Sequence, residues 1–137
     1  MRLSKTTEYA IRALIYLAND EKQIYSVNYL HKELDIPYKY LAKLMHNLSE
    51  AGFVYSVQGN QGGYRINRNK SDIYLYQIVD VVEGLDDYSR CILGFDKCND
   101  EDPCPMHFYW TEERGHLTEM LYKISLNDLC KSLKKRI

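Results

Sequence analysis

Three cysteines and a histidine stand close together in the second half of this 137-residue chain. Six residues separate Cys91 from Cys98, five separate Cys98 from Cys104, and two separate Cys104 from His107. Thiolates bind both zinc and iron–sulfur clusters, and an imidazole can join either set of ligands. Zinc sites usually pair cysteines two to four residues apart, which is closer than the spacing here. The spacing predicts a metal site in this loop and leaves the choice of metal open.

Acidic residues surround these thiols, since Asp96, Asp100, Glu101 and Asp102 lie between or beside the cysteines. Like-charge repulsion would raise the pKa of each thiol unless a cation is bound. The alternative is a loop whose cysteines are reduced and hold no metal. The fourth cysteine, Cys130, lies in a helical pattern away from the cluster and is predicted to be a small core residue.

The loop lies between two helical patterns. The pattern before it ends at Gly84 and consists of Leu75, Ile78, Val79 and Val82. A longer pattern begins at about Pro105 and carries on one stripe Leu117, Met120, Leu121 and Ile124. Ser125 is predicted to cap a last short helix with Leu126, Leu129 and Leu133. A long helix apart from a small head needs a surface to pack on, and the same helix of a second copy supplies one, which predicts a homodimer.

The first half of the chain predicts three helices. The first is apolar over most of its circumference, which predicts burial on more than one side. Its apolar residues are Ala10, Ile11, Ala13, Leu14, Ile15, Leu17 and Ala18. Ser26 is predicted to cap a second helix with Val27, Leu30 and Leu34. After a tight break at 35–37, Pro37 fits the first turn of a third helix, which ends at Gly52 and buries Leu41, Leu44, Met45 and Leu48.

The opposite face of the third helix is polar and basic, and it carries Tyr38, Lys39, Lys43, His46 and Asn47. Two short helices joined by a tight turn, the second with such a face, are what a helix-turn-helix needs to read DNA. The alternative is a helical hairpin whose charged face is simply exposed to solvent. The predicted contacts of the helical part with DNA are Lys5, Ser26, Tyr38, Lys39, Tyr40 and Lys43.

A β-hairpin is predicted directly after these helices. Residues 53–57 and 64–67 favour strands, and the six residues between them include three glycines and an asparagine. A helix-turn-helix followed by such a hairpin is a winged helix, whose wing can lie along the DNA backbone or in the minor groove. An ordinary hairpin is the alternative. The predicted wing contacts are Gln58, Asn60, Gln61, Tyr64 and Arg65.

The fold class expected is mainly α with a small β-hairpin: a winged helix-turn-helix domain over 1–70, then a cysteine-bearing loop and dimerisation helices over 71–137. The first part holds ten basic and six acidic side chains, whereas the second holds eight and thirteen. The basic part could face a polyanion, or the two parts could simply attract each other. No stretch is long and apolar enough to span a bilayer and no secretion signal opens the chain, so we expect a cytoplasmic protein.

Catalysis is not expected. The four histidines are scattered along the chain, no serine lies in a nucleophile elbow, and no phosphate-binding loop is present.

Several stretches together resemble the Rrf-type family of bacterial winged-helix transcriptional regulators, which includes the IscR and NsrR branches. The resemblance is strongest at Gly62-Gly63-Tyr64-Arg65-Ile66 and extends over 1–4, 8–14, 36–41, 48–54, 56–59, 104–107 and 124–129. It implies a homodimer crossed through the long C-terminal helix that binds palindromic double-stranded promoter DNA, often as a repressor.

The resemblance also implies an iron–sulfur cluster on Cys91, Cys98 and Cys104, which would sense iron, redox state or nitric oxide. In one branch the fourth ligand of a [2Fe–2S] cluster is a histidine at the position of His107. In another it is an acidic residue of the partner's first helix, at the position of Glu8. His107 is favoured, and with it [2Fe–2S] over [4Fe–4S]. The alternative is a regulator of the same fold without a cluster, which uses zinc, thiol oxidation or a small-molecule signal.

Three positions depart from the family pattern. The gap between Cys91 and Cys98 is six residues where the IscR-like pattern has five. Gln58 replaces an arginine of many relatives, and Ala42 replaces a glutamate of the IscR-like branch. Because arginine prefers guanine and glutamine prefers adenine, the operator of this protein does not follow from that of either branch.

Overall fold

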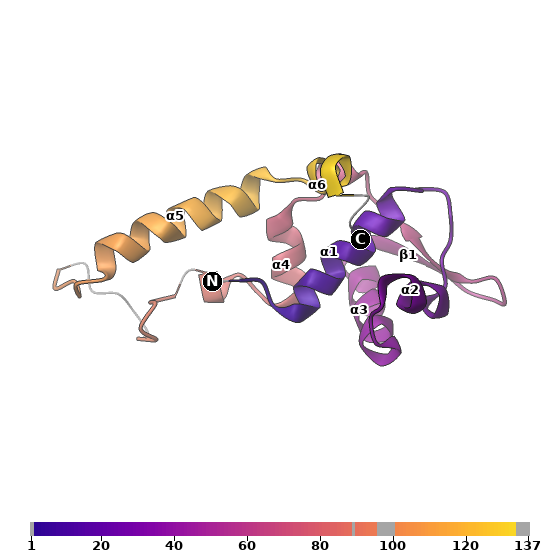
Figure 1. Ribbon diagram of the computed structural model, residues 1–137, viewed down its shortest axis with the longest axis horizontal. Helices are drawn as coiled ribbons and strands as arrows, with labels where there is room; N and C mark the ends of the chain where they lie inside the picture. The colour runs from indigo at the N-terminus through magenta and orange to yellow at the C-terminus, as the bar shows by residue number, and fades with distance from the viewer. Residues whose placement is uncertain (1, 89, 96–100, 134–137) are drawn as a thin grey trace.

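The computed structural model describes residues 2–88, 90–95 and 101–133. A compact head contains α1 (Lys5–Ala18), α2 (Val27–Leu34), α3 (Tyr38–Glu50), β1 (Val54–Val57) and β2 (Gly63–Ile66). Two 3₁₀ turns, η1 (Lys70–Asp72) and η2 (Asp86–Tyr88), flank α4 (Leu75–Val82). The long α5 (His107–Lys123) projects from the head as an arm, and α6 (Leu126–Leu133) lies back against α1 (Figure 1). The predicted fold class, mainly helical with one hairpin, is confirmed.

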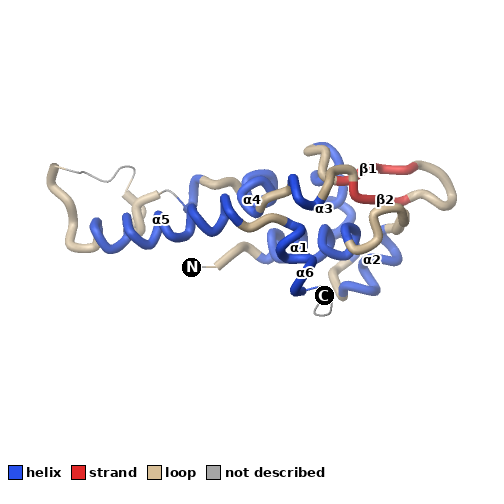
Figure 2. Tube along the Cα trace, turned by 90° about the horizontal axis from the view of Figure 1, so that it is seen from above, coloured by secondary structure: helices blue, strands red, loops and turns tan. Residues whose placement is uncertain are grey.

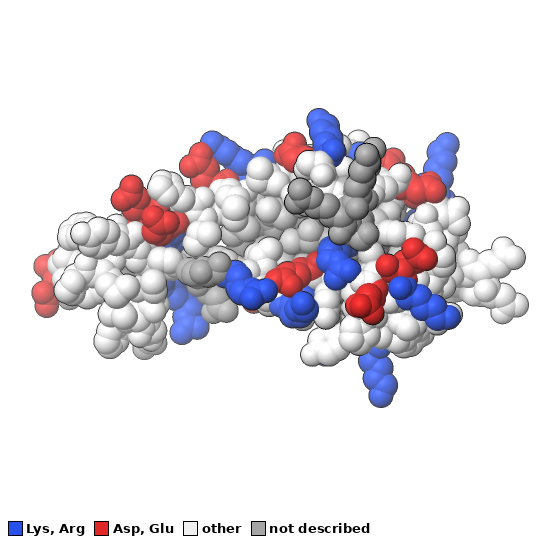
Figure 3. Space-filling view, in the orientation of Figure 1, with Lys and Arg blue, Asp and Glu red and all other residues white. Residues whose placement is uncertain are grey.

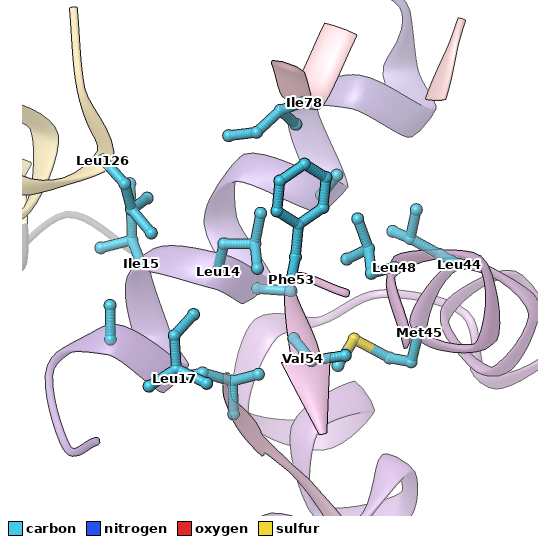
Figure 4. Close-up of a cluster of buried hydrophobic side chains, with 14 of the residues drawn as sticks. Leu14, Ile15, Leu17, Leu44, Met45, Leu48, Phe53, Val54, Ile78 and Leu126 are labelled. Atoms are coloured by element: carbon cyan, nitrogen blue, oxygen red, sulfur yellow. The ribbon is translucent and has the colours of Figure 1, made fainter. Parts of the chain in front are cut away.

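Helix α1 runs through the centre of the head. Ser4 caps it, because the Ser4 hydroxyl accepts a hydrogen bond from the Thr7 amide at 3.1 Å. Its buried residues, from Thr7 to Ala18, contact α4 and α6 as well as α2, α3 and β2, so the predicted burial on more than one side is confirmed. Figure 4 shows Leu14 and Ile15 of this helix close to Phe53, Ile78 and Leu126.

The helix-turn-helix forms as predicted. The Ser26 hydroxyl accepts from the Tyr29 amide at 3.0 Å and caps α2. Asp35, at φ 53°, ends α2 in the left-handed conformation. Pro37 takes the N-cap position of α3 rather than a place in its first turn, so α3 begins at Tyr38. Gly52, at φ 84°, follows α3 and has the left-handed conformation that its position predicts.

The hairpin is antiparallel, with Val54 opposite Ile66 and Val57 opposite Gly63. β1 begins one residue later than predicted, and β2 both begins and ends one residue earlier than predicted. Phe53 directly precedes β1; its side chain is buried in the core of the head, and its carbonyl accepts a hydrogen bond from the Asn67 amide. Figure 2 shows the hairpin at the opposite end of the molecule from α5.

The chain leaves helical geometry at Ile124, which was predicted to continue the stripe of α5. The Ile124 carbonyl accepts from the Leu75 amide at 3.0 Å, and the Leu126 amide donates to the Ile73 carbonyl at 2.7 Å. These bonds tie the end of α5 to the segment before α4. Ser125 and Asp128 then cap α6 reciprocally, because the Ser125 hydroxyl accepts from the Asp128 amide and the Asp128 carboxylate accepts from the Ser125 amide.

Helices α4 and α6 share the core of the head, to which Ile78, Leu126 and Cys130 contribute. Cys130 is 4% exposed, which confirms it as a core residue, and burial raises the pKa of its thiol. The functional boundary at residue 70 stays a prediction. In the described part of the chain, no helix combines the length and the apolar character that crossing a bilayer requires.

Candidate nucleic-acid interface and cysteine loop

The outer face of α3 is open to solvent, as predicted. Tyr38 and Tyr40 are 50% and 59% exposed, and Lys39 and Lys43 are exposed beside them. The opposite face of the helix, which includes Leu41, is buried in the core. The helix therefore presents two lysines and two phenol rings on a rigid support, which is what a recognition helix requires.

The base of the wing is bonded to the segment just before α2. The Tyr25 amide donates to the Tyr64 carbonyl at 2.9 Å, and the Tyr64 amide donates to the Tyr25 carbonyl at 2.8 Å. A Cβ atom on Gly63 would lie 2.3 Å from the Tyr25 carbonyl oxygen, so only glycine permits this pairing. A Cβ atom on Gly62 would lie 2.2 Å from the Val57 carbonyl oxygen across the hairpin. The two adjacent glycines thus set the position of the wing relative to the helix-turn-helix.

A groove of about 390 Å³ separates the start of α2 from the tip of the wing. Its walls are Gln23, Ile24, Tyr25, Ser26, Tyr29, Asn60, Gln61 and Gly62. The structure therefore brings three of the predicted contacts, Ser26, Asn60 and Gln61, to one feature of the surface. Gln58 lies nearer the strand, where its side-chain amide donates to the Ser56 hydroxyl at 3.2 Å.

Arg65 lies on the exposed face of the wing. It pairs across the strands with Tyr55, and its guanidinium lies 5.1 Å from the centre of the Tyr55 ring. Both side chains are exposed, so the ring limits the orientations of the guanidinium without covering it.

The first turn of α1 carries two predicted residues that contact each other. The Lys5 ammonium lies 3.6 Å from the Glu8 carboxylate, and Arg2 donates to the same carboxylate at 3.3 Å. Lys5 also lies over the ring of Tyr9, which makes an edge contact with Tyr40 of α3. Lys5 is thereby placed near the recognition helix, whereas Glu8 is held by two cations of its own chain.

The cysteine loop meets the first turns of α5. The His107 amide donates to the Cys104 carbonyl at 3.0 Å, so these two residues share one turn. The indole N–H of Trp110 donates to the Arg90 carbonyl at 2.7 Å, which holds the residue before Cys91 against the same helix. Cys98 lies outside the described residues. Among the residues described, no three candidate ligands come together closely enough to hold a metal ion.

Two arginines that sequence reasoning did not select hold the helix-turn-helix in place. Arg12 of α1 donates to the Leu34 carbonyl at the end of α2. Arg68 donates to the Ala51 carbonyl at 3.0 Å, at the end of α3, and its guanidinium lies 4.7 Å from the centre of the Phe53 ring. A cation next to a helix C-terminus is favoured by the helix dipole, but a single sequence does not reveal that residues 12 and 68 reach those ends.

Basic side chains do not gather into one large patch on the face shown in Figure 3, where Lys and Arg lie among Asp and Glu. The wing tip, residues 58–63, carries no charge. Contacts with a polyanion would therefore depend on individual lysines and arginines around α3 and the strands, with close backbone approach at the tip.

An open helix-turn-helix face followed by a glycine-rich hairpin defines a winged-helix DNA-binding protein. A family model described as Rrf2, iron-dependent transcriptional regulator, matches residues 3–132. The chain belongs to this family of transcriptional regulators, as the sequence predicted.

Relatives agree with this assignment. A protein of Aquifex aeolicus named among the HTH-type transcriptional regulators is 32% identical over all of this chain and 96% of its own length. The solved structure of CymR, the global cysteine regulator of B. subtilis, matches with a TM-score of 0.78 and 26% identity over 96% of this chain and 97% of CymR. IscR of T. potens matches with a TM-score of 0.77 and 26% identity over 100% of this chain and 92% of IscR.

Proposed function

We propose that this chain is a homodimeric transcriptional repressor that inserts α3 into the major groove of palindromic promoter DNA. One observation carries the proposal: α3 exposes a face of lysines and tyrosines, and a glycine-tipped wing is bonded through Tyr25 and Tyr64 to the segment just before α2. Rigid placement of both parts favours simultaneous contact with a groove and the adjacent backbone.

The DNA contacts divide by chemistry. Lys5, Lys39, Lys43 and Arg65 contact phosphates, which contributes affinity for any sequence and makes binding depend on salt. Tyr38, Tyr40 and Gln58 lie near base edges and contribute sequence preference. Ser26, Asn60, Gln61 and Tyr64 line or border the groove between α2 and the wing, where the DNA backbone would lie.

Gel-shift titrations against genomic fragments test this assignment. Lys43→Ala should weaken binding to every fragment and make the dependence of affinity on salt less steep, by about one unit in its logarithmic slope. Gln58→Ala should instead change the ranking of fragments while leaving the salt dependence intact. Absence of a retarded band with every fragment, for the metal-loaded and metal-free protein alike, would overturn the proposal.

The second part of the proposal is a sensor in the loop 91–107, where Cys91, Cys98, Cys104 and His107 hold an iron–sulfur cluster. Donor chemistry supports this fit, because thiolates and imidazole are the ligands such clusters take and Cys104 and His107 lie in one turn. When bound, the cluster supplies a centre sensitive to iron, redox state or nitric oxide. Its gain or loss would shift the packing of the loop on α5 and hence the spacing of the two recognition helices.

His107 is the better fourth ligand of the two candidates. Glu8 would have to give up its contacts with Arg2 and Lys5 before it could bind iron in a partner subunit. His107 already lies beside Cys104. A nitrogen ligand at this position favours [2Fe–2S] over [4Fe–4S].

A regulator without a cluster is the second candidate, and the likeness to a cysteine regulator supports it. In that version the loop thiols bind zinc or oxidise. Anaerobic purification followed by visible absorption and iron and sulfide analysis separates the two. A coloured protein that loses its colour in Cys104→Ala but keeps it in Cys130→Ala favours the cluster, because Cys130 is buried in the core. A colourless protein that retains zinc or forms a reversible disulfide favours the second candidate.

A further inference from the structure

Glu83 joins two distant parts of the chain at the end of α4. One carboxylate oxygen, Oε2, accepts the Ser4 amide at 2.9 Å, and the other, Oε1, accepts the Tyr88 hydroxyl at 2.5 Å. Hydrogen bonds to a carboxylate are shorter and stronger than those between neutral groups. The carboxylate is therefore a two-sided link between residue 4 and residue 88.

On one side of this link lies the start of α1. Ser4 caps that helix through its hydroxyl, while its amide is bonded to Glu83. The next residue is Lys5, and Tyr9 one turn later contacts Tyr40 of the recognition helix. A shift of Ser4 would therefore move the first turn of α1, which lies next to the Tyr9–Tyr40 contact.

On the other side lies the start of the cysteine loop. The Tyr88 ring is 8% exposed and packs with Leu75, Val79 and Leu121, between α4 and α5. Two residues later the Arg90 carbonyl is bonded to Trp110, and Cys91 follows. Cys91 thus lies three residues after Tyr88 and directly after a residue that is bonded to α5, so a rearrangement at Cys91 begins close to the Tyr88 hydroxyl.

We propose that Glu83 is a positioning residue that couples the state of the cysteine loop to the N-terminal turn of α1, and so to the recognition helix. This inference rests on the proposed function, because it assigns a route for the regulation of DNA binding by the loop. When the loop pulls Tyr88 away, Oε1 of the carboxylate loses the Tyr88 hydroxyl as a donor, and the grip of the carboxylate on Ser4 is weakened. Ser4 and the first turn of α1 then lose the anchor that holds them against α4.

A purely local role, in which Glu83 only stabilises the end of α4, is the competing explanation. Both explanations predict lower stability for Glu83→Gln. They differ in whether a change made at the loop cysteines reaches Ser4, and in whether the Tyr88 hydroxyl is needed for it.

Amide exchange at Ser4, followed by NMR on the full-length protein, makes this distinction. Iodoacetamide supplies the change at the loop, because the described loop thiols of Cys91 and Cys104 are partly exposed and Cys130 is buried. In the wild type, alkylation should speed exchange of the Ser4 amide by about tenfold, the effect of losing one hydrogen bond to a charged group. In Tyr88→Phe, exchange should already be fast and alkylation should change it less than about twofold. An equal response in wild type and Tyr88→Phe, or no response in wild type, would overturn the coupling.

DNA affinity before and after alkylation supplies a second readout. The ratio of the two affinities should approach one in Tyr88→Phe and in Glu83→Gln, while both unmodified variants still bind. Ratios in the variants equal to that of the wild type would contradict the proposal. If the wild type binds no DNA at all, the proposed function fails, and the exchange measurement still decides the coupling.

Discussion

Gly62 and Gly63 are adjacent, and at each position a backbone carbonyl oxygen lies so close that a Cβ atom would not fit. Gly62 approaches the Val57 carbonyl across the hairpin, and Gly63 approaches the Tyr25 carbonyl before α2. Gly63 also has φ 155°, which L side chains rarely adopt. Gly59, by contrast, has φ 107° with no atom near the position of a Cβ. Gly63 and Gly59 therefore both have a positive φ, but only at Gly63 does a neighbouring carbonyl oxygen also leave no room for a side chain.

Gly63→Ala should lower the free energy of unfolding by more than about 2 kcal/mol, because the new methyl group breaks the Tyr25–Tyr64 pairing as well as straining the backbone. Gly59→Ala should cost only about 1 kcal/mol, from backbone strain alone. Urea unfolding of both variants measures the difference. Equal losses would show that the approach to Tyr25 is not a constraint in solution.

Among the secondary-structure elements, α3 depends on groups outside itself. Pro37 supplies no side-chain cap at its beginning, and at its end the Ala51 carbonyl relies on Arg68. The side-chain amide of Asn67 donates to the next carbonyl, that of Gly52, at 3.1 Å. Strand β2 of the wing is therefore followed by two residues, Asn67 and Arg68, whose side chains hold the end of α3.

Arg68→Met should lower the free energy of unfolding by about 1 to 3 kcal/mol, because it removes the hydrogen bond to Ala51 and the stacking on Phe53. Arg65→Met is the matched control on the same segment. It should leave stability within about 0.5 kcal/mol, since Arg65 is exposed, and weaken DNA binding instead. Thermal unfolding together with a gel shift measures both quantities. A reversed pattern would mean that the roles of the two arginines are exchanged.

Glu83 makes the junction of α4 and α1 sensitive to acid. Burial by itself would raise the pKa of this carboxyl, but hydrogen bonds from Ser4, Tyr88 and Thr7 outweigh burial and hold the pKa below its usual 4.5. A carboxyl whose pKa is depressed on folding stabilises the protein above the unfolded pKa and loses that contribution as pH falls through the folded pKa.

The stability difference between wild type and Glu83→Gln should therefore be largest near neutral pH and should shrink below about pH 4.5. Urea unfolding at a series of pH values measures it. A difference that stays constant down to pH 3 would contradict a contribution from the ionised carboxylate.

For the molecule as a whole, the main feature is that the arm formed by α5 leaves large apolar side chains exposed. In the single chain only Trp110 and Leu121 of α5 are buried, whereas its exposed apolar residues are Phe108, Tyr109, Met120 and Tyr122. Leu117 is half-buried, so the predicted stripe is covered only in part. So much apolar surface on one helix favours a second copy of the chain as its partner.

Met120→Glu should weaken the proposed dimer by at least about tenfold, because a dimer interface would bury the new charge. Thr111→Glu, nine residues earlier and so half a turn around the helix from Met120, should weaken the dimer less than Met120→Glu does. Sedimentation over a range of concentrations measures both. A dimer that persists in Met120→Glu would place the interface elsewhere.

Local rules were enough to predict much of this protein. The helical spacing of apolar residues identified the helices, Ser26 and Ser125 identified two helix starts, and Gly52 identified a helix end, because each depends on neighbours within one turn. The cysteines and His107 could be named as candidate metal ligands from the sequence, because the ability to bind a metal depends on the type of side chain and these residues lie close together in the chain. The stretch Gly62–Gly63 marked the wing, although nothing local revealed that Gly63 touches Tyr25.

Contacts between residues far apart in the chain depended on the folded structure. The pairing of Ile124 with Leu75 ended α5 one residue before its apolar pattern did, because a hydrogen bond to another segment competes with the helical one. Arg68 at the end of α3, and Glu83 between Ser4 and Tyr88, are visible only once the chain is folded. Such partners are chosen by proximity in space, which side-chain type and sequence spacing do not encode locally.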